Sequence, residues 1–202
     1  MTSESAEVAG AGEQSPASSF EGIAILGSHP ATVMMAPFDD PKWLIYACSP
    51  HNVEKRELPR CDEWFEVHVP VADSTRAYPY LRSLENLEKV WMRDKDAVHL
   101  FPGGKLIDEE RLKNRFGPFH FTSSIAYIMA AAIEDCERLD IENIALFGIM
   151  QSHPNEYTYQ RPGVQHMIWE ACRPDRKKLG LKRLNVWAPD ISKLFDPPPE
   201  DF

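Results

Sequence analysis

Short apolar runs, separated by helical and turn-forming stretches, dominate the pattern of the chain. Consecutive apolar positions are typical of strands that are buried on both faces of a sheet. Such runs occupy residues 22–26, 43–48, 64–69 and 144–149. Two further strands are predicted over residues 97–101 and 184–187, which end before Pro102 and Pro189. We therefore predict a sheet of short, mostly buried strands.

Helical spacing fills the stretches between these runs. Residues 121–133 are apolar nearly all round, which is typical of a helix packed inside the core. The side chains available to cap its start are Thr122, Ser123 and Ser124. Helical spacing also covers residues 78–91, 162–171 and, briefly, 33–36. Because strands alternate with helices, we predict an α/β fold that is Rossmann-like, with a mainly parallel sheet, helices on both faces and a single domain.

The two ends of the chain differ from its middle in composition. Residues 1–19 are rich in Ser, Ala, Gly and Glu and contain almost no large apolar side chain, so we predict a disordered acidic tail. Residues 196–202 are rich in proline and acidic residues and are interpreted as a second tail. The Rossmann-like α/β domain is therefore expected over residues 20–195.

Charge and cysteine content narrow the classes of partner. The chain has 202 residues and a formal net charge of −9, which disfavours tight binding to nucleic acid. Its four cysteines are widely spaced, so neither a zinc knuckle nor a disulfide framework is indicated. No run reaches the length of a membrane span and the N-terminus lacks a signal-peptide pattern, so we expect a cytoplasmic protein. A homo-oligomer is compatible with the sequence.

The fold prediction selects the loops that would form a binding site. In parallel α/β sheets, ligands bind beyond the carboxyl ends of the strands. This rule selects residues 27–32, 48–52, 101–105 and 151–161 as the rim of one site. The turn at Gly27 matches neither the dinucleotide-binding glycine pattern nor the P-loop. Asp94 and Asp96 match the Asp-x-Asp of metal-dependent sugar transfer, but they precede the predicted strand 97–101 and are interpreted as surface charge.

Chemically capable side chains gather in and after the last of these loops. The hydroxyls of Tyr157 and Tyr159 can donate hydrogen bonds to a departing phosphate, although their rings can equally anchor the next helix. Arg161 is a candidate for a bidentate phosphate contact or an ordinary surface arginine. His153 and His166 are candidate bases, because imidazole titrates near neutrality.

Several of these segments together resemble a known family. They are Phe121-Thr-Ser-Ser with its apolar helix, the strand within 141–149, the tyrosine pair and the closing residues 184–194. The combination resembles the bacterial sialyltransferases of glycosyltransferase family 42. It also resembles the related Rossmann-like proteins around the archaeal 6-hydroxymethylpterin pyrophosphokinase, the motility-associated glycosyltransferases and small phage proteins. The resemblance covers residues 23–194 loosely and is specific mainly after residue 121.

The resemblance implies roles for individual residues. The turn at residues 27–30 takes the place of the family's Gly-Asn-Gly-Pro turn, and Ser49 takes the place of a second nucleotide-binding asparagine. Ser123 matches a serine at a helix start that touches the donor, and the family's insertion with a catalytic histidine is absent. The nucleotide-binding candidates are therefore Gly27, Ser28, His29, Pro30, Ser49 and Ser123, together with Arg161, which is a candidate because of its charge. The catalytic candidates are Tyr157, Tyr159 and either His153 or His166.

These roles imply a nucleotide-binding transferase that is most like a glycosyltransferase. It would move a sugar from a nucleotide-sugar donor to an unknown acceptor, with no metal and no cofactor besides the donor. One alternative is a non-catalytic interaction or virion-associated protein on the same fold. Another is a pterin-type pyrophosphokinase, which would need a divalent ion and carboxylates to hold it.

Overall fold

A single parallel sheet organises the protein. The structure is a computed structural model that describes residues 19–48, 58–68, 87–151, 156–190, 192 and 194–195. Within these residues, seven strands pair in the order β5-β4-β3-β2-β1-β6-β7, all parallel. The strands are β1 (Gly22–Leu26), β2 (Trp43–Cys48), β3 (Glu63–Glu66), β4 (Val90–Met92), β5 (Gly104–Leu106), β6 (Asn143–Phe147) and β7 (Asn185–Trp187).

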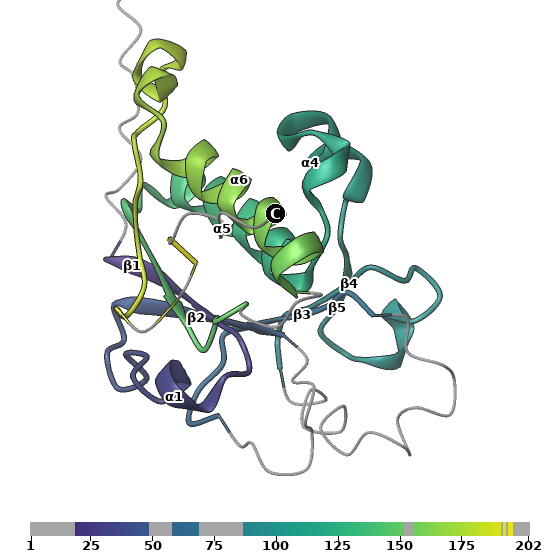
Figure 1. Cartoon of the computed structure of the whole chain (residues 1–202). Coiled ribbons are helices and arrows are strands. Elements are labelled where there is room, and N and C mark those ends of the chain that lie inside the picture. Colours follow the sequence, from purple (N-terminus) through teal and green to yellow (C-terminus); the bar gives the residue numbers. More distant parts are fainter. Residues whose placement is uncertain are drawn as a thin grey trace, which may run out of the picture.

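Helices cover both faces of this sheet. The α-helices are α1 (Pro30–Val33), α4 (Glu109–Phe116), α5 (Ser124–Leu139) and α6 (Arg161–Cys172). Shorter helical turns are η3 (Val98–Leu100), η4 (Pro118–His120), the π-helix η5 (Glu156–Gln160) and η6 (Pro174–Leu179). Figure 1 shows α4, α5 and α6 on one face of the sheet and α1 on the other. The predicted α/β fold with helices on both faces is confirmed.

Helix α5 forms the centre of the larger core. The hydroxyl of Ser123 accepts a hydrogen bond from the Ala126 N–H at 3.3 Å, so Ser123 is the cap among the three predicted candidates. The helix ends at Asp140, whose left-handed φ of 60° breaks the helical path. Side chains such as Ile128 and Ile133 are fully buried against the sheet. The prediction of a core helix is therefore confirmed.

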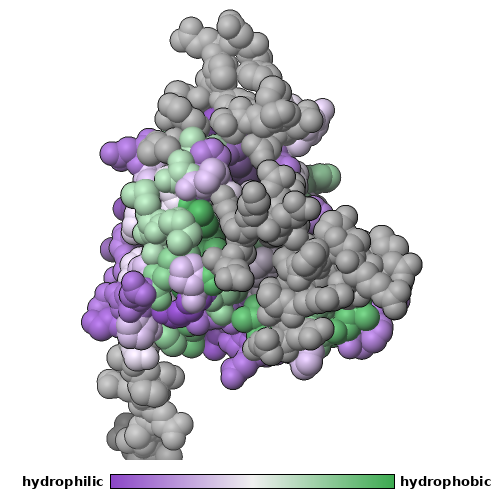
Figure 2. All heavy atoms as spheres, turned by 90° about the horizontal axis from the view of Figure 1, so that it is seen from below, coloured by the Kyte–Doolittle hydropathy of each residue, from purple (hydrophilic) through white to green (hydrophobic). Residues whose placement is uncertain are grey.

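The opposite face of the sheet carries a smaller apolar cluster. Val33, Ala36 and Phe38, in and after α1, pack there with the inward side chains of the strands. Figure 2 views this face and shows apolar residues gathered between hydrophilic ones. Met34 and Met35, which directly follow α1, are each 60% exposed. The core is thus split between the two faces, and surface methionines follow α1.

The strand order reverses beside β1. From β1 the chain moves outward through β2, β3, β4 and β5, and it then crosses back to place β6 on the other side of β1. The pairing aligns Gly22 with Asn143 and Leu26 with Phe147, so β1 and β6 end side by side. Such a reversal is a topological switch point, where open parallel sheets bind their ligands.

Two glycines hold the ends of β1 and β6 together. The N–H of Gly27 donates to the Phe147 carbonyl at 2.8 Å, and the N–H of His29 donates to the Gly148 carbonyl at 2.8 Å. The Gly148 N–H donates to the buried hydroxyl of Thr32 at 2.7 Å. A Cβ on Gly27 would overlap the Gly148 carbonyl, and Gly148 itself has a φ of +66°. The two turns can approach this closely only because both positions lack a side chain.

Two predicted elements between residues 78 and 101 differ in the structure. The helix predicted over residues 78–91 is wrong at its end, because Val90 and Met92 are buried on one face of strand β4 and Trp91 lies on the other. Its earlier part, up to residue 86, lies outside the described residues. The strand predicted over residues 97–101 is also wrong. That run forms η3, because Ala97 and Phe101, four positions apart, both turn inward.

Because of these two differences, two loops lie at the opposite edge of the sheet from the one that the sequence predicts. Asp94 and Asp96 follow β4, so they lie beyond its carboxyl end, contrary to the prediction that they precede a strand. The side chain of Asp94 accepts a hydrogen bond from the Asp96 N–H at 2.9 Å, which forms a local turn. Residues 101–105 lead into the start of β5 and therefore do not belong to the rim. The other predicted strands are present, with ends shifted by at most a few residues.

Replacement of Gly27 by alanine should destabilise the fold. The added Cβ would overlap the Gly148 carbonyl, which is held in place by the His29 N–H. We expect the free energy of unfolding in urea to fall by about 1–3 kcal/mol. Ser28→Ala is the matched control in the same turn and should have little effect. Equal unfolding midpoints for the two variants would contradict this explanation.

Candidate functional site

The candidate site lies beyond the carboxyl ends of β1 and β6. Residues 27–29 follow β1 and residues 148–151 follow β6. Helices α5 and α6 also begin at this edge, since each leads back toward the start of a following parallel strand. The two helix starts adjoin: the Thr122 hydroxyl donates to the Gln160 carbonyl at 3.4 Å, and a Cβ on Gly163 would lie 2.5 Å from the same hydroxyl.

Several backbone N–H groups of the turn after β1 already donate hydrogen bonds within the protein. The N–H groups of Gly27 and His29 bond to the strand and turn of β6, and the Ala31 N–H donates to His29 Nδ1 at 3.3 Å. Because Nδ1 accepts this bond, the proton of a neutral His29 ring lies on Nε2. The close contact with the Gly148 carbonyl is enough to explain why residue 27 is a glycine. Ser28 is half-buried, and Pro30 is the exposed first residue of α1.

Gln151 is the most unusual residue at this edge. Its side chain is only 6% exposed, and among the described residues neither the amide oxygen nor the amide nitrogen has a hydrogen-bond partner. An unpartnered buried amide costs about 1–3 kcal/mol. The backbone is also left-handed, with a φ of 46°, which costs a non-glycine residue on the order of 1 kcal/mol more. Gln151 is the first residue of the predicted rim segment 151–161, but it was not among the predicted site residues.

The predicted phosphate contacts lie at the two helix starts. Ser123 is half-buried at the cap of α5, and its hydroxyl proton is not used in the bond that it accepts from Ala126. Arg161 is the first residue of α6 and is 2% exposed, so it is not an ordinary surface arginine. Free N–H groups at the start of a long helix favour anions, and a guanidinium nearby adds positive charge.

The other predicted residues fall in several places. Tyr159 lies in the π-helix η5 and is 68% exposed. Tyr157 belongs to the same helical turn, but its side chain lies outside the described residues, as do Ser49 and His153. Single π-turns of this kind occur frequently at functional sites.

His166 lies at the junction of α6 with η4. Its ring stacks on that of His120, with centroids 3.5 Å apart and an angle of 13° between the rings. Its Nε2 is 3.0 Å from the Phe116 carbonyl, which can only accept, so Nε2 carries a proton. Burial lowers the pKa of His120, and the neighbouring His166 lowers it further, whereas Glu170 opposes the change. The stacked partner His120 was missing from our predicted residues.

A second polar cluster follows β4 and β5. The Tyr127 hydroxyl donates to Glu109 at 2.5 Å, and Lys113 and Arg93 pair with the same carboxylate at 2.6 and 3.2 Å. Burial alone would raise the pKa of Glu109, but the hydrogen bonds from Lys113, Tyr127 and Arg93 outweigh it and lower the pKa to about 2. The cluster ties α4 to α5 and leaves the carboxylate charged at neutral pH.

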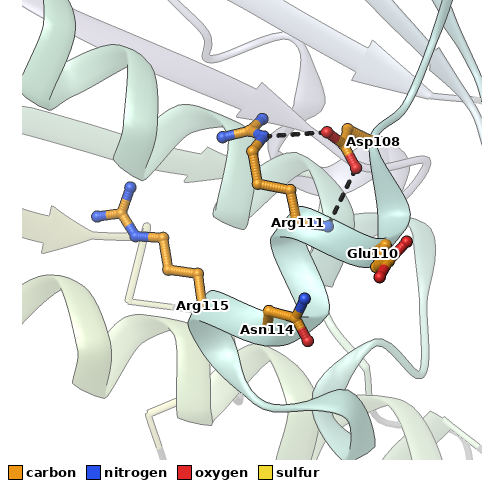
Figure 3. Close-up of a pocket in the computed structure, with 5 residues that line it drawn as sticks. All are labelled: Asp108, Glu110, Arg111, Asn114 and Arg115. Atoms are coloured by element: carbon orange, nitrogen blue, oxygen red, sulfur yellow. Dashed lines mark hydrogen bonds and ion pairs between the residues drawn. The ribbon is translucent and has the colours of Figure 1, made fainter.

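Two surface hollows lie on other parts of the molecule. One, of about 590 Å³, is lined by Asp108, Glu110, Arg111, Asn114 and Arg115. Figure 3 shows all five side chains on α4 and its cap, with Arg111 turned back to Asp108. Arg115 pairs with Glu137 of α5 at 2.6 Å, so the positive charges here already have acidic partners. The other hollow, of about 520 Å³, includes Glu142 and Lys182 and lies near the amino ends of β6 and β7.

The four cysteines are buried or half-buried. Burial raises the pKa values of Cys48, Cys61 and Cys136 to about 12, so these thiols stay protonated. Among residues that the structure describes, no three His, Cys, Asp or Glu side chains are grouped as metal ligands would be. Over the same ranges, no helix has the length and apolar character needed to cross a membrane.

Comparisons with models of protein families, with curated proteins and with solved structures find no match to this chain. The resemblance to a glycosyltransferase family and the activity that it implies therefore stay predictions from the sequence. The site is defined by the fold and by the side chains placed at the ends of β1 and β6.

The pKa of Glu109 predicts how stability depends on pH. Its folded value of about 2 lies below the ordinary 4.5, so its contribution is fully present above about pH 4.5 and is lost as the pH falls toward 2. Glu109→Gln should lower the free energy of unfolding at pH 7 by roughly 1–3 kcal/mol and flatten its decline between those pH values. The control is Glu110→Gln, an exposed neighbour on the same helix. Indistinguishable pH profiles for wild type and Glu109→Gln would contradict the assignment.

Proposed function

We propose that the protein binds a nucleotide between the turns after β1 and β6 and transfers a group from it. The observation that carries this proposal is the reversal of strand order between β1 and β6, with the starts of α5 and α6 at the same edge. Folds of this type bind nucleotides at such a reversal. The predicted donor is a nucleotide sugar, and the proposed reaction is a glycosyltransferase-like transfer that needs no metal.

The proposed roles follow from the charge and position of the side chains. The start of α5, with Ser123, would bind the phosphate, and the buried guanidinium of Arg161 would offset its negative charge. Tyr157 and Tyr159 would donate hydrogen bonds to the leaving phosphate. The Nε2 proton of His166 is engaged by the Phe116 carbonyl, so Nδ1 would be the nitrogen that accepts a proton, and both His153 and His166 stay candidate bases.

A second candidate is a non-catalytic interaction protein on the same fold. Two observations favour it. The N–H groups of Gly27 and His29 are already bonded within the protein, so they are not free to cradle a phosphate. Large aromatic side chains are also exposed along η4, η5 and α6, namely Phe119 at 85%, Tyr159 at 68% and Trp169 at 54%. Exposed aromatic residues are common at sites where proteins bind partners.

Titration calorimetry with nucleoside monophosphates and nucleotide sugars would test the leading proposal. We expect the full chain to bind at least one of them with a Kd below about 1 mM, and we expect Ser123→Ala to weaken that binding about tenfold, as the loss of a hydrogen bond to a charged group does.

Asp108→Ala is the matched control, because Asp108 caps α4 as Ser123 caps α5. Both variants lose a helix cap, but only Ser123→Ala should lose affinity. An absence of binding to every compound at millimolar concentration would rule out the leading proposal and favour the interaction protein. An equal loss of affinity in both variants would show that Ser123 acts only through stability.

A further inference from the structure

Gln151 presents a buried carboxamide that the fold itself does not use. Two polar groups of the same turn have partners: the Gly148 N–H donates to Thr32, and the Ile149 carbonyl accepts the Ser192 hydroxyl at 2.8 Å. The amide of Gln151, at 6% exposure, has no partner at either end within the part of the chain that the structure describes. Buried amides are rarely left in this state. A group from outside the chain is the natural partner for this one.

The chemistry of the amide indicates what that group is. A glutamine carboxamide presents one acceptor beside two donors in a single plane. A fully ionised phosphate offers only acceptors, so it would leave the amide oxygen of Gln151 unpaired, and a metal cation would satisfy the oxygen alone. A flat edge with a neighbouring donor and acceptor satisfies both ends. Nucleobases have such edges, and glutamine binds adenine in this bidentate way.

We propose that Gln151 binds the base edge of the nucleotide and so contributes to the choice of base. This inference rests on the proposed nucleotide site and adds a role to a residue of the turn after β6. The phosphate and the base would then be held by different elements. The start of α5 would hold the phosphate, whereas Gln151 would hold the base.

Gln151→Met tests this role, because methionine has nearly the same length but cannot form the two hydrogen bonds. The full chain would be titrated with the four ribonucleoside monophosphates and with ribose 5-phosphate. We expect the affinity for the best-bound monophosphate to fall at least about tenfold. The affinity for ribose 5-phosphate should stay within about twofold, since it lacks a base. Without ligand, the thermal midpoint of the variant should equal or exceed that of wild type, because an unpartnered buried amide is removed.

Gln165→Met is the matched control. The Gln165 amide donates to the Leu194 carbonyl at 2.9 Å, so its loss should lower the thermal midpoint and leave nucleotide affinity unchanged. Three results would overturn the inference while the nucleotide site stands. They are unchanged monophosphate affinity in Gln151→Met, an equal loss of ribose 5-phosphate affinity, and a thermal midpoint lowered as in Gln165→Met. If wild type binds none of the monophosphates, the proposed function fails and this inference fails with it.

Discussion

The close contact between Gly27 and Gly148 is the constraint on which the rest of the structure depends. It lets the turns after β1 and β6 share hydrogen bonds, and the buried Thr32 hydroxyl satisfies the remaining Gly148 N–H. These turns lie at the ends of β1 and β6, which pair side by side at the switch point of the sheet. Gln151 lies three residues further on, at the same edge of the sheet. A change at either glycine should therefore affect both stability and the site.

Much of the fold follows from the local sequence pattern, and the predictions that are wrong have a physical cause. Strands β1 and β2 lie where the sequence predicts them, because strands buried on both faces leave continuous apolar runs. Helix α5 is likewise recognisable from its apolar surface and serine cap. Strand β4 has only three residues, too few for alternation to be distinguished from helical spacing. Residues 97–101 are apolar enough for a strand, but the inward positions are four apart, which selects a helical turn.

The candidate site was predictable in position more than in detail. The rule for parallel sheets placed it near Gly27 and Gln151, and the serine at the start of α5 was recognisable as a cap. The isolation of the Gln151 amide and the stacking of His166 on His120 depend on contacts between distant elements, so no local pattern reports them. The need for a glycine at position 27 could not be predicted either, because the residue that it contacts, Gly148, is 121 residues away in the sequence.

A single measurement addresses the central claim that the switch point between β1 and β6 binds the ligand. Backbone amide chemical shifts of the full chain can be followed by NMR while the best-bound nucleotide is added. We predict that the largest changes fall on residues 27–32, on residues 148–151 and on the first turn of α5. Changes confined to the hollow on α4, or to the junction of η4 with α6, would contradict the claim and place the ligand elsewhere.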